Sequence, residues 1–278
     1  MMRHFFSHKT TLPGLGLAGI ALMGLALLSG CDTLFGEPEE NVLTKIEDAV
    51  WQATAPDIGV IVGVRANAEG RTNPAGPAQA KQKVPFAVRF TVNDEYQFIR
   101  WQAFQGGVLL AADQAVFENP AAAETWLSIQ GTGNSFTVQP LTLARPRVDT
   151  TNLPQGGSLR VALNYPVRIY FAGPLAPDSL ILEETGKPNF TNISITGKLS
   201  YGQGADVDLT DRFSAALGEN DSFLVLTPLP DNPLPGNCNV TVTLGADIQS
   251  IHTIDGETYR IPLLKPVTLN YGVHDRAD

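Results

Sequence analysis

Residues whose types could carry out nucleophilic chemistry are few and scattered in this sequence. Such chemistry needs a serine or cysteine, a histidine base and an orienting carboxylate held together. Of the four histidines, His4 and His8 stand near the N-terminus and His274 in a charged C-terminal tail, so only His252 lies well inside the chain. The sequence has no Gly-x-Ser-x-Gly motif. We therefore expect no catalytic residues and no enzyme activity.

Carboxylates spaced closely enough to bind a metal ion occur at Asp206, Asp208 and Asp211. Three carboxylates in so short a segment could bind Ca²⁺. The segment lacks the central glycine and the closing glutamate of an EF-hand loop, and acidic loops are common in an acidic chain. Cysteine and histidine spacings typical of zinc sites are missing from the sequence. We expect no metal site and no cofactor, and keep these three aspartates as the candidate for calcium.

The N-terminal segment has the composition of a secretion signal. Arg3 and Lys9 make it basic, and no acidic residue precedes Asp32. An apolar run follows from Leu12 to Leu28, interrupted by one proline and several glycines. A transmembrane helix needs roughly 20 apolar residues, whereas a signal sequence needs a shorter stretch of up to roughly 15. Residues 1–30 are therefore predicted to be a signal peptide that is removed.

The apolar run ends in Leu28-Ser29-Gly30-Cys31. This tetrapeptide resembles the lipobox of bacterial lipoproteins, in which a hydrophobic residue and two small residues precede an invariant cysteine. The resemblance implies cleavage before Cys31, a diacylglyceryl thioether on its thiol, and commonly a further acyl chain, such as palmitate, on its amine. Each buried acyl CH₂ contributes about 0.8 kcal/mol, so two or three chains would anchor the protein firmly. The alternative is an ordinary secretion signal in which Cys31 is incidental.

The expected location is the cell envelope, with the protein anchored to a bacterial membrane on the extracytoplasmic side. Asp32 follows the lipidated cysteine. In lipoproteins of some Gram-negative bacteria, an aspartate at this position resembles the signal for retention in the inner membrane. Sorting rules differ between bacterial groups, so the inner and the outer membrane both stay open.

The predicted mature chain is strongly acidic. Removal of residues 1–30 takes Arg3 and Lys9 away and leaves 248 residues, with 17 basic against 28 acidic side chains and a net charge of −11. Such a chain repels phosphate backbones, which argues against nucleic acid as a partner. The same charge keeps a tethered protein soluble and away from anionic headgroups.

Cys31 and Cys238 are the only cysteines of the sequence. With Cys31 committed to lipid, no internal disulfide can form, although secretion would permit one. Cys238 stands at the start of a predicted strand and is interpreted as a small, partly buried residue. A reactive thiol or an intermolecular bridge is the alternative.

The rest of the sequence indicates an all-β protein with two Ig-like β-sandwich domains in tandem. Short strand patterns are separated by turn residues at intervals of roughly 8–12 residues, and Gly and Pro account for 46 of 278 residues. A short helix is expected over Leu43–Trp51. We predict a lipidated N-terminus and tether over 31–50, a first sandwich over 51–148, a linker over 149–158, a second sandwich over 159–273 and a tail over 274–278.

Strand patterns in the first sandwich differ in kind. Ile58–Val64 is a continuous β-branched run, which predicts a strand buried on both faces. Residues 67–82 are rich in Gly, Pro, Ala and Asn and are expected to form a loop. Strict alternation over Val84–Val92 predicts a strand with one buried face, and the turn at 93–95 then predicts a hairpin. Further strands are expected at Val108–Leu110, Gln114–Phe117, Thr125–Gln130 and Ser135–Leu143.

The segment from Phe86 to Trp101, FAVRFTVNDEYQFIRW, resembles a motif of bacterial Ig-like and related β-repeat modules. In that motif an alternating strand leads to an aromatic-x-Phe-x-x-Trp hairpin, and here Tyr96, Phe98 and Trp101 match it. Each ring buries roughly 150–250 Å², so the cluster is most simply part of the core. A surface platform that stacks sugar rings is the alternative.

The segment from Pro166 to Leu180, PVRIYFAGPLAPDSL, resembles the opening of the S-layer-type (SbsA-type) bacterial Ig-like domain. There a strand that ends in Phe leads to a Pro-Met-Asp-Pro-x-Ser-Leu turn, from which Leu175 and Ala176 depart. The resemblance covers about 155–273. It implies further strands at 192–197, 223–228, 239–245 and 267–271 and a turn at Asp255-Gly256.

These observations predict a membrane-anchored envelope lipoprotein that acts as a non-catalytic structural spacer or binding module. Its expected partners are the membrane, through Cys31, and an envelope protein or glycan, recognised by loops or by strand addition at a sheet edge. One alternative is a carbohydrate-binding lipoprotein, which needs exposed aromatic rings. The other is an enzyme that acts on envelope polysaccharide, which needs two carboxylates roughly 5–10 Å apart beside an exposed Trp51, Trp101 or Trp126.

Overall fold

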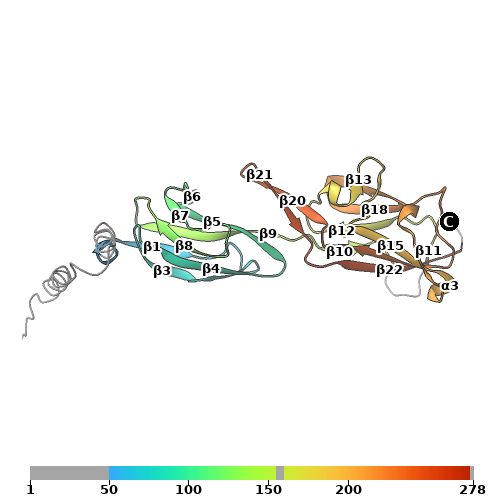
Figure 1. The fold of residues 1–278 in the computed structure, drawn as a ribbon, viewed down its shortest axis with the longest axis horizontal. Coiled ribbons are helices and arrows are strands. Elements are labelled where there is room, and N and C mark those ends of the chain that lie inside the picture. Colours follow the sequence, from blue (N-terminus) through green and yellow to red (C-terminus); the bar gives the residue numbers. More distant parts are fainter. Residues whose placement is uncertain (1–49, 155–159, 276–278) are drawn as a thin grey trace, which may run out of the picture. The chain divides into compact units, whose positions relative to one another are not determined.

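The computed structural model describes residues 50–154 and 160–275 (Figure 1). The predictions for the signal peptide, Cys31 and nearly all of the tether lie outside these residues. Of the predicted helix at Leu43–Trp51, residues 50 and 51 are described, and both belong to a helical segment at 50–54. Within the described residues, no helix has the length and apolar character needed to span a membrane. The chain divides into two units, Met1–Thr54 and Ala55–Asp278, and the described strands belong to the second.

The second unit contains two separate hydrophobic cores. One core is built from residues between 58 and 138, and the other from residues between 153 and 273. Most buried residues of each core come from the strands of two different sheets. The prediction of an all-β protein with two β-sandwiches is therefore confirmed.

The first sandwich consists of a five-stranded and a four-stranded sheet. The five-stranded sheet has the order β3 (Gly76–Lys81), β1 (Asp57–Val62), β9 (Ser135–Ala144), β5 (Tyr96–Gln105) and β6 (Val108–Leu109). The four-stranded sheet has the order β2 (Gly70–Asn73), β4 (Phe86–Val92), β8 (Glu124–Ile129) and β7 (Ala115–Phe117). Strand β1 runs parallel to β9 and antiparallel to β3. Consequently β3 and β6 form the two edges of the larger sheet.

Strand β1 is not buried on both faces, contrary to the sequence prediction. Its side chains alternate, with Ile58, Val60 and Val62 buried and Ile61 48% exposed. The β-branched residues suit the strand conformation on either face, so their presence does not by itself signal burial. Only one face of β1 packs against the core.

The predicted loop at 67–82 instead forms strands β2 and β3, which are joined around a cis Asn73–Pro74 peptide bond. Strand β2 pairs with β4, and β3 pairs with β1 along its whole length. Gly, Pro, Ala and Asn have low strand propensity, but pairing with established neighbours overrides that preference. Composition alone therefore gave the wrong prediction for this segment.

The predicted hairpin between β4 and β5 is also wrong, because these strands belong to different sheets. The alternation over β4 is confirmed, since Val88 and Phe90 are buried and their neighbours are exposed. At the turn over 93–95 the chain crosses from one sheet to the other. The aromatic side chains of the two strands therefore meet across the core instead of lying side by side on one sheet.

An aromatic cluster holds the two sheets of the first sandwich together. The ring centroids of Phe90, Phe98 and Trp101 are 5.8 to 6.3 Å apart, with tilted or edge-to-face geometry. Trp101 is only 2% exposed, and its indole Nε1–H donates a hydrogen bond to the Ala122 carbonyl oxygen at 3.1 Å. The interpretation as core is confirmed for Trp101, which excludes it as a sugar platform. Phe98 is half-buried and packs against the same core, whereas Tyr96, the third residue of the motif, is half-buried and is not part of that core.

The second sandwich also pairs a four-stranded with a five-stranded sheet. The first has the order β10 (Val148–Thr151), β12 (Val167–Phe171), β18 (Phe223–Pro228) and β17 (Phe213–Leu217). The second has the order β11 (Arg160–Val161), β22 (Val267–Val273), β19 (Asn239–Leu244), β15 (Ile193–Lys198) and β16 (Asp206–Asp208). Two hairpins add β13 (Ile181–Leu182) with β14 (Lys187–Pro188), and β20 (Gln249–Ile254) with β21 (Glu257–Pro262).

Helical segments in the second sandwich are short. They comprise η1 (Pro177–Ser179), α3 (Leu199–Gly202), η2 (Thr210–Arg212) and η3 (Glu219–Asp221). The expected strands at 192–197, 223–228, 239–245 and 267–271 match β15, β18, β19 and β22 closely. The Asp255-Gly256 turn joins β20 to β21, with φ of +53° and +82° at its two residues.

The predicted linker at 149–158 differs from the structure. Residues Val148–Thr151 form β10, which pairs with β12 in the second sandwich. Leu153 is buried in the second core as well. Polar turn residues suggested a linker, but an edge strand tolerates such residues because one of its sides faces solvent. Residues 155–158 of the predicted linker lie outside the described part of the chain.

Replacing the buried indole should destabilise the first sandwich strongly. Trp101→Ala removes the ring from the aromatic cluster and leaves the Ala122 carbonyl without its donor, at an expected cost of about 3–5 kcal/mol. Trp126→Ala is the matched control, because that side chain is 53% exposed and its removal should cost less than about 1 kcal/mol. Calorimetric unfolding measures both, and equal losses would contradict the assignment of the core.

Candidate functional site

The histidine inside the second sandwich, His252, does not form a catalytic group. Its Nε2 lies 3.0 Å from Ser250 Oγ, but Ser250 is only 1% exposed and its hydroxyl also contacts the Ile261 carbonyl oxygen. Burial lowers the pKa of His252. A hydroxyl enclosed in this way cannot reach a substrate, so the pair stabilises the β20–β21 hairpin internally.

Asp206, Asp208 and Asp211 lie close in sequence, but the structure gives them separate roles. The Asp208 carboxylate accepts hydrogen bonds from Thr210, whose backbone N–H lies 2.9 Å from Oδ1, and these bonds lower the pKa of Asp208. Asp211 forms an ion pair with Lys187 at 3.2 Å, and Asp206 begins β16. In the described ranges, no three His, Cys, Asp or Glu side chains are grouped so that they could hold a metal ion. The structure therefore gives the calcium candidate no support.

The two cysteines fall into different parts of the chain. Cys31 lies outside the described residues. Cys238 is fully buried in the second core, directly before β19, and this burial raises the pKa of its thiol. A protonated thiol in such a place behaves as a small hydrophobic side chain.

The three tryptophans separate clearly by exposure. Trp101 is core, whereas Trp126 projects from the outer face of β8 and is 53% exposed. Trp51 in the helical segment at 50–54 is also partly exposed. Of the residues that the sequence singled out for sugar stacking, Trp126 has the geometry that this interaction needs.

A shallow depression of about 480 Å³ surrounds Trp126. Ala87 of β4 is its direct cross-strand partner and leaves the indole face uncovered on that side. Glu118 and Glu124 line the same depression, and both are exposed. Glu124 forms an ion pair with Arg89 at 3.7 Å. Carboxylate oxygens at such positions can accept hydrogen bonds from hydroxyl groups.

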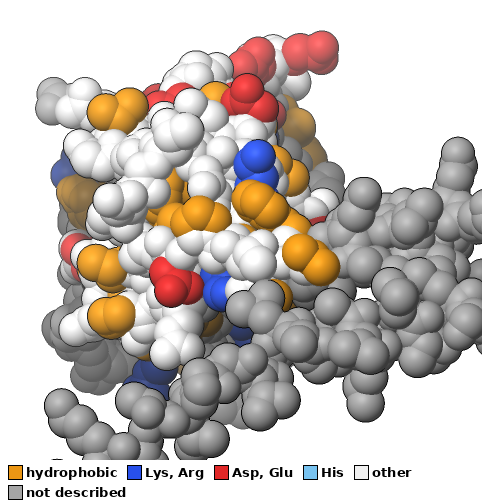
Figure 2. Space-filling view, turned by 90° about the vertical axis from the view of Figure 1, so that its left-hand side faces the viewer, with side chains coloured by type: hydrophobic (Ala, Val, Ile, Leu, Met, Phe, Trp, Pro, Cys, Tyr) orange, Lys and Arg blue, Asp and Glu red, His pale blue; other side chains and the backbone are white. Residues whose placement is uncertain are grey.

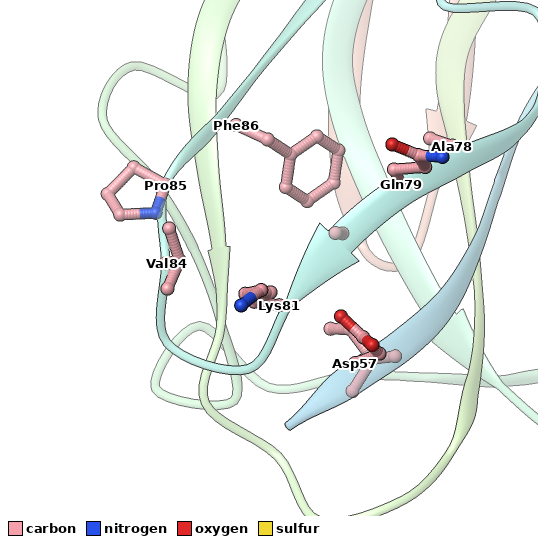
Figure 3. A pocket seen from close by; sticks show the side chains of 9 residues that line it. Asp57, Ala78, Gln79, Lys81, Val84, Pro85 and Phe86 are labelled. Atoms are coloured by element: carbon pink, nitrogen blue, oxygen red, sulfur yellow. The ribbon is translucent and has the colours of Figure 1, made fainter. Parts of the chain in front are cut away.

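A second and larger groove, of about 550 Å³, lies beside the edge strand β3 (Figure 3). Its apolar lining comes from Ile58 of β1, Ala78 and Ala80 of β3, and the segment Val84–Phe86 that leads into β4. Figure 3 shows the Phe86 ring turned toward β3 across the groove. Asp57, Gln79 and Lys81 supply the polar part of the lining.

The position of this groove follows from the lengths of the strands. Strand β2 pairs with β4 only from Arg89 to Val92, so no described strand lies beside the first residues of β4 on that side. Within the described residues, strand β3 in the other sheet pairs with β1 alone. The mouth between the two sheets is therefore open here, and small side chains at positions 78 and 80 widen it.

Further apolar side chains are exposed on the first sandwich. Val108, Leu109 and Val116 lie on β6 and β7, and the last two help to line a depression of about 290 Å³. Figure 2 shows the end of the sandwich at which β1 begins. Hydrophobic side chains gather across the middle of its described surface, with single acidic and basic side chains among them. The first sandwich thus exposes apolar surface at several places.

The sequence predictions missed the groove, because residues 67–82 were expected to form a loop. A signal was present in the segment GPAQAK, where small apolar and polar residues alternate with period two. Pro77 and Lys81 in the same segment are residues with which proteins protect edge strands. Together these features indicate a short edge strand.

Comparison with known proteins identifies no family for this chain. No protein-family model and no curated protein sequence matches it. Solved structures that match include a titin substructure (12% identity, 78% of this chain and 97% of that chain, TM-score 0.21) and the titin Ig tandem domains A164-A165 (10%, 79% and 94%, TM-score 0.20). Titin domains A168-A170 match at 12% identity over 70% of this chain and 61% of that chain, with a TM-score of 0.26. At these scores the architecture of two β-sandwiches rests on the strands of this chain themselves.

Proposed function

We propose that this chain is a lipid-anchored protein of the bacterial envelope whose two β-sandwiches form a non-catalytic binding module. The observation that carries the proposal is the tetrapeptide Leu28-Ser29-Gly30-Cys31 at the end of the apolar run. The folded part supports it, because the described strands begin at Asp57, well after that cysteine. A lipid on Cys31 would therefore leave both sandwiches free to meet partners outside the cytoplasm.

A non-catalytic role is supported by the state of the candidate catalytic groups. The hydroxyl of Ser250 is enclosed next to His252. The carboxylates beside Trp126 are exposed and one of them is paired with Arg89. Acid catalysis of glycoside cleavage typically uses a carboxyl group enclosed in an apolar environment, and these two carboxylates are not enclosed.

The second sandwich is proposed to be of the SbsA-type bacterial Ig-like class. Strand β12 ends at Phe171, as the resemblance implies, and the turn around η1 follows it. Leu175, Ala176 and Leu180 of this turn are fully buried. The two departures from the motif, at positions 175 and 176, therefore occupy core positions that apolar side chains fill well.

Carbohydrate binding is the second candidate function, and the exposed Trp126 favours it. The indole face is open, and the two glutamates and Asn119 beside it supply hydrogen-bond acceptors. Sugars combine an apolar ring face with hydroxyl groups, so such a surface fits them.

Fatty-acid labelling tests the anchor directly. In cells given labelled palmitate, the chain should incorporate label, and Cys31→Ser should abolish incorporation because the acceptor thiol is gone. Cys238→Ser is the matched control and should keep full labelling, since this buried thiol is far from the predicted cleavage site in sequence. Labelling that survives Cys31→Ser would refute the assignment of the lipid site.

Retention on insoluble envelope glycan tests the carbohydrate alternative. Trp126→Ala should reduce binding by about tenfold, because stacking of a ring on an indole typically contributes on the order of 1 kcal/mol or more. Ile61→Ala, at an exposed position of the other sheet, should leave binding unchanged. Equal retention of both variants and the parent chain would eliminate sugar binding at Trp126.

A further inference from the structure

The groove beside β3 exposes backbone groups that are able to pair with another strand. The hydrogen bond from the Gln82 N–H to the Pro56 carbonyl oxygen fixes the phase of the β1–β3 ladder. With that phase, Ala78 and Ala80 bond to β1, whereas the N–H and C=O of Gln79 point away from it. No other strand of the described chain lies on that side of β3.

The opposite wall of the groove, at the start of β4, also has backbone groups that pair with no described strand. The bond from the Phe90 N–H to the Ala123 carbonyl oxygen places the backbone groups of Phe86 and Val88 toward β8. Those of Ala87 therefore point to the side on which β2 would continue, but β2 ends opposite Arg89. In the described chain both sheets therefore end here at backbone groups that face no further strand. Ala78 and Phe86 lie on opposite sides of the groove (Figure 3), and Ala80 belongs to the same apolar lining.

We propose that this groove binds a short extended peptide segment of a partner protein, which adds a strand to β3. The inference rests on the proposed binding function and names its partner class. The residue paired with Gln79 would exchange main-chain hydrogen bonds with it and point outward. The residues on either side of that residue would point inward and fill the space between the two alanines and Phe86.

The length and side chains of the partner segment follow from the lining. Pro77 has no N–H, so pairing cannot extend as a regular ladder toward the start of β3. A groove of about 550 Å³ takes a few residues with medium-sized apolar side chains. The segment should therefore alternate apolar and polar residues over a short stretch.

The net charge of the chain favours a basic peptide over a second copy of the chain as the occupant of the groove. The groove lining itself carries one charge of each sign, because Asp57 and Lys81 are cross-strand partners. The chain as a whole carries a net charge of −9, so two copies would repel each other, whereas a segment with basic ends would be attracted. The geometry and charge therefore favour a basic, alternating peptide.

Binding is tested with a defined set of heptapeptides of the pattern K-Φ-T-Φ-T-Φ-K, in which Φ is Val, Ile, Leu or Phe. The full chain in detergent micelles is titrated against each fluorescently labelled peptide, and empty micelles serve as the blank. Members of the set should bind, and peptides with Glu in place of both Lys should bind more weakly. Hydrogen exchange measured by mass spectrometry should show new protection of the Gln79 amide.

Two variants and one control locate the contact. Gln79→Pro removes the outward N–H but spares the bonds to β1, and should weaken binding by at least about fivefold. Gln79→Ala keeps the N–H and should change affinity by less than about twofold. Ala78→Phe fills the groove and should weaken binding even if Gln79→Pro fails to fold, which circular dichroism reports.

Each result decides the proposal. Binding that both Gln79→Pro and Ala78→Phe weaken, and that Gln79→Ala preserves, supports it. Failure of the whole peptide set, or binding that ignores the variants, overturns it. Concentration-dependent dimers that Gln79→Pro abolishes would assign the groove to a second copy and also overturn it. Palmitate labelling of the same preparations distinguishes the lipid-anchor proposal from the peptide-binding proposal. A lipidated chain that binds no peptide contradicts peptide binding in the groove and leaves the anchor untouched.

Discussion

Burial of alternate side chains between two sheets is the interaction on which both sandwiches depend. Neither core contains a disulfide, since Cys238 is the one cysteine in the described chain and it is free. The first core is held by aliphatic side chains and by the cluster of Phe90, Phe98 and Trp101. The Trp101 indole also donates a hydrogen bond to Ala122, in the segment that precedes β8 of the opposite sheet. Aromatic contacts and apolar burial therefore supply the stability that small disulfide-rich domains draw from their disulfides.

The same constraint creates the surfaces that can bind partners. A sheet that is not closed into a barrel must end in edge strands, and these present unpaired backbone groups. In the first sandwich the edge at β3 is combined with small side chains and an early end of β2, so an apolar groove opens between the sheets. Pro77 limits how far another strand can pair there, which is one of the ways in which proteins protect an open edge from aggregation.

Sequence patterns predicted the existence of strands better than their partners. Alternation over β4 identified the buried face correctly, because a period of two depends only on the local backbone. It could not show that β4 and β5 lie in different sheets, since a tight turn suits both a hairpin and a crossing between sheets. Strands β2 and β3 were missed because their Gly- and Pro-rich residues are held in place by pairing with β1 and β4.

For the candidate sites too, the sequence predicted the character of single residues better than which residues come together in space. The aromatic motif correctly placed Trp101 in the core and Phe98 against it, but not Tyr96, and Trp126 was among the tryptophans considered for exposure. The groove beside β3 could be found only from the topology, because its lining comes from three strands and a loop whose pairing partners the sequence did not reveal. The short spacing of Asp206, Asp208 and Asp211 suggested a cluster, yet hydrogen bonds and an ion pair give these side chains separate partners.

The central claim is that a membrane lipid on the first mature residue presents two β-sandwiches outside the cytoplasm. Mass spectrometry of the N-terminal peptide from the chain purified out of its native membrane tests it most directly. The account predicts a peptide that begins at Cys31 and carries the added mass of a diacylglyceryl group, with or without a further acyl chain. An unmodified thiol at this position, or a peptide that still begins at Met1, would contradict it.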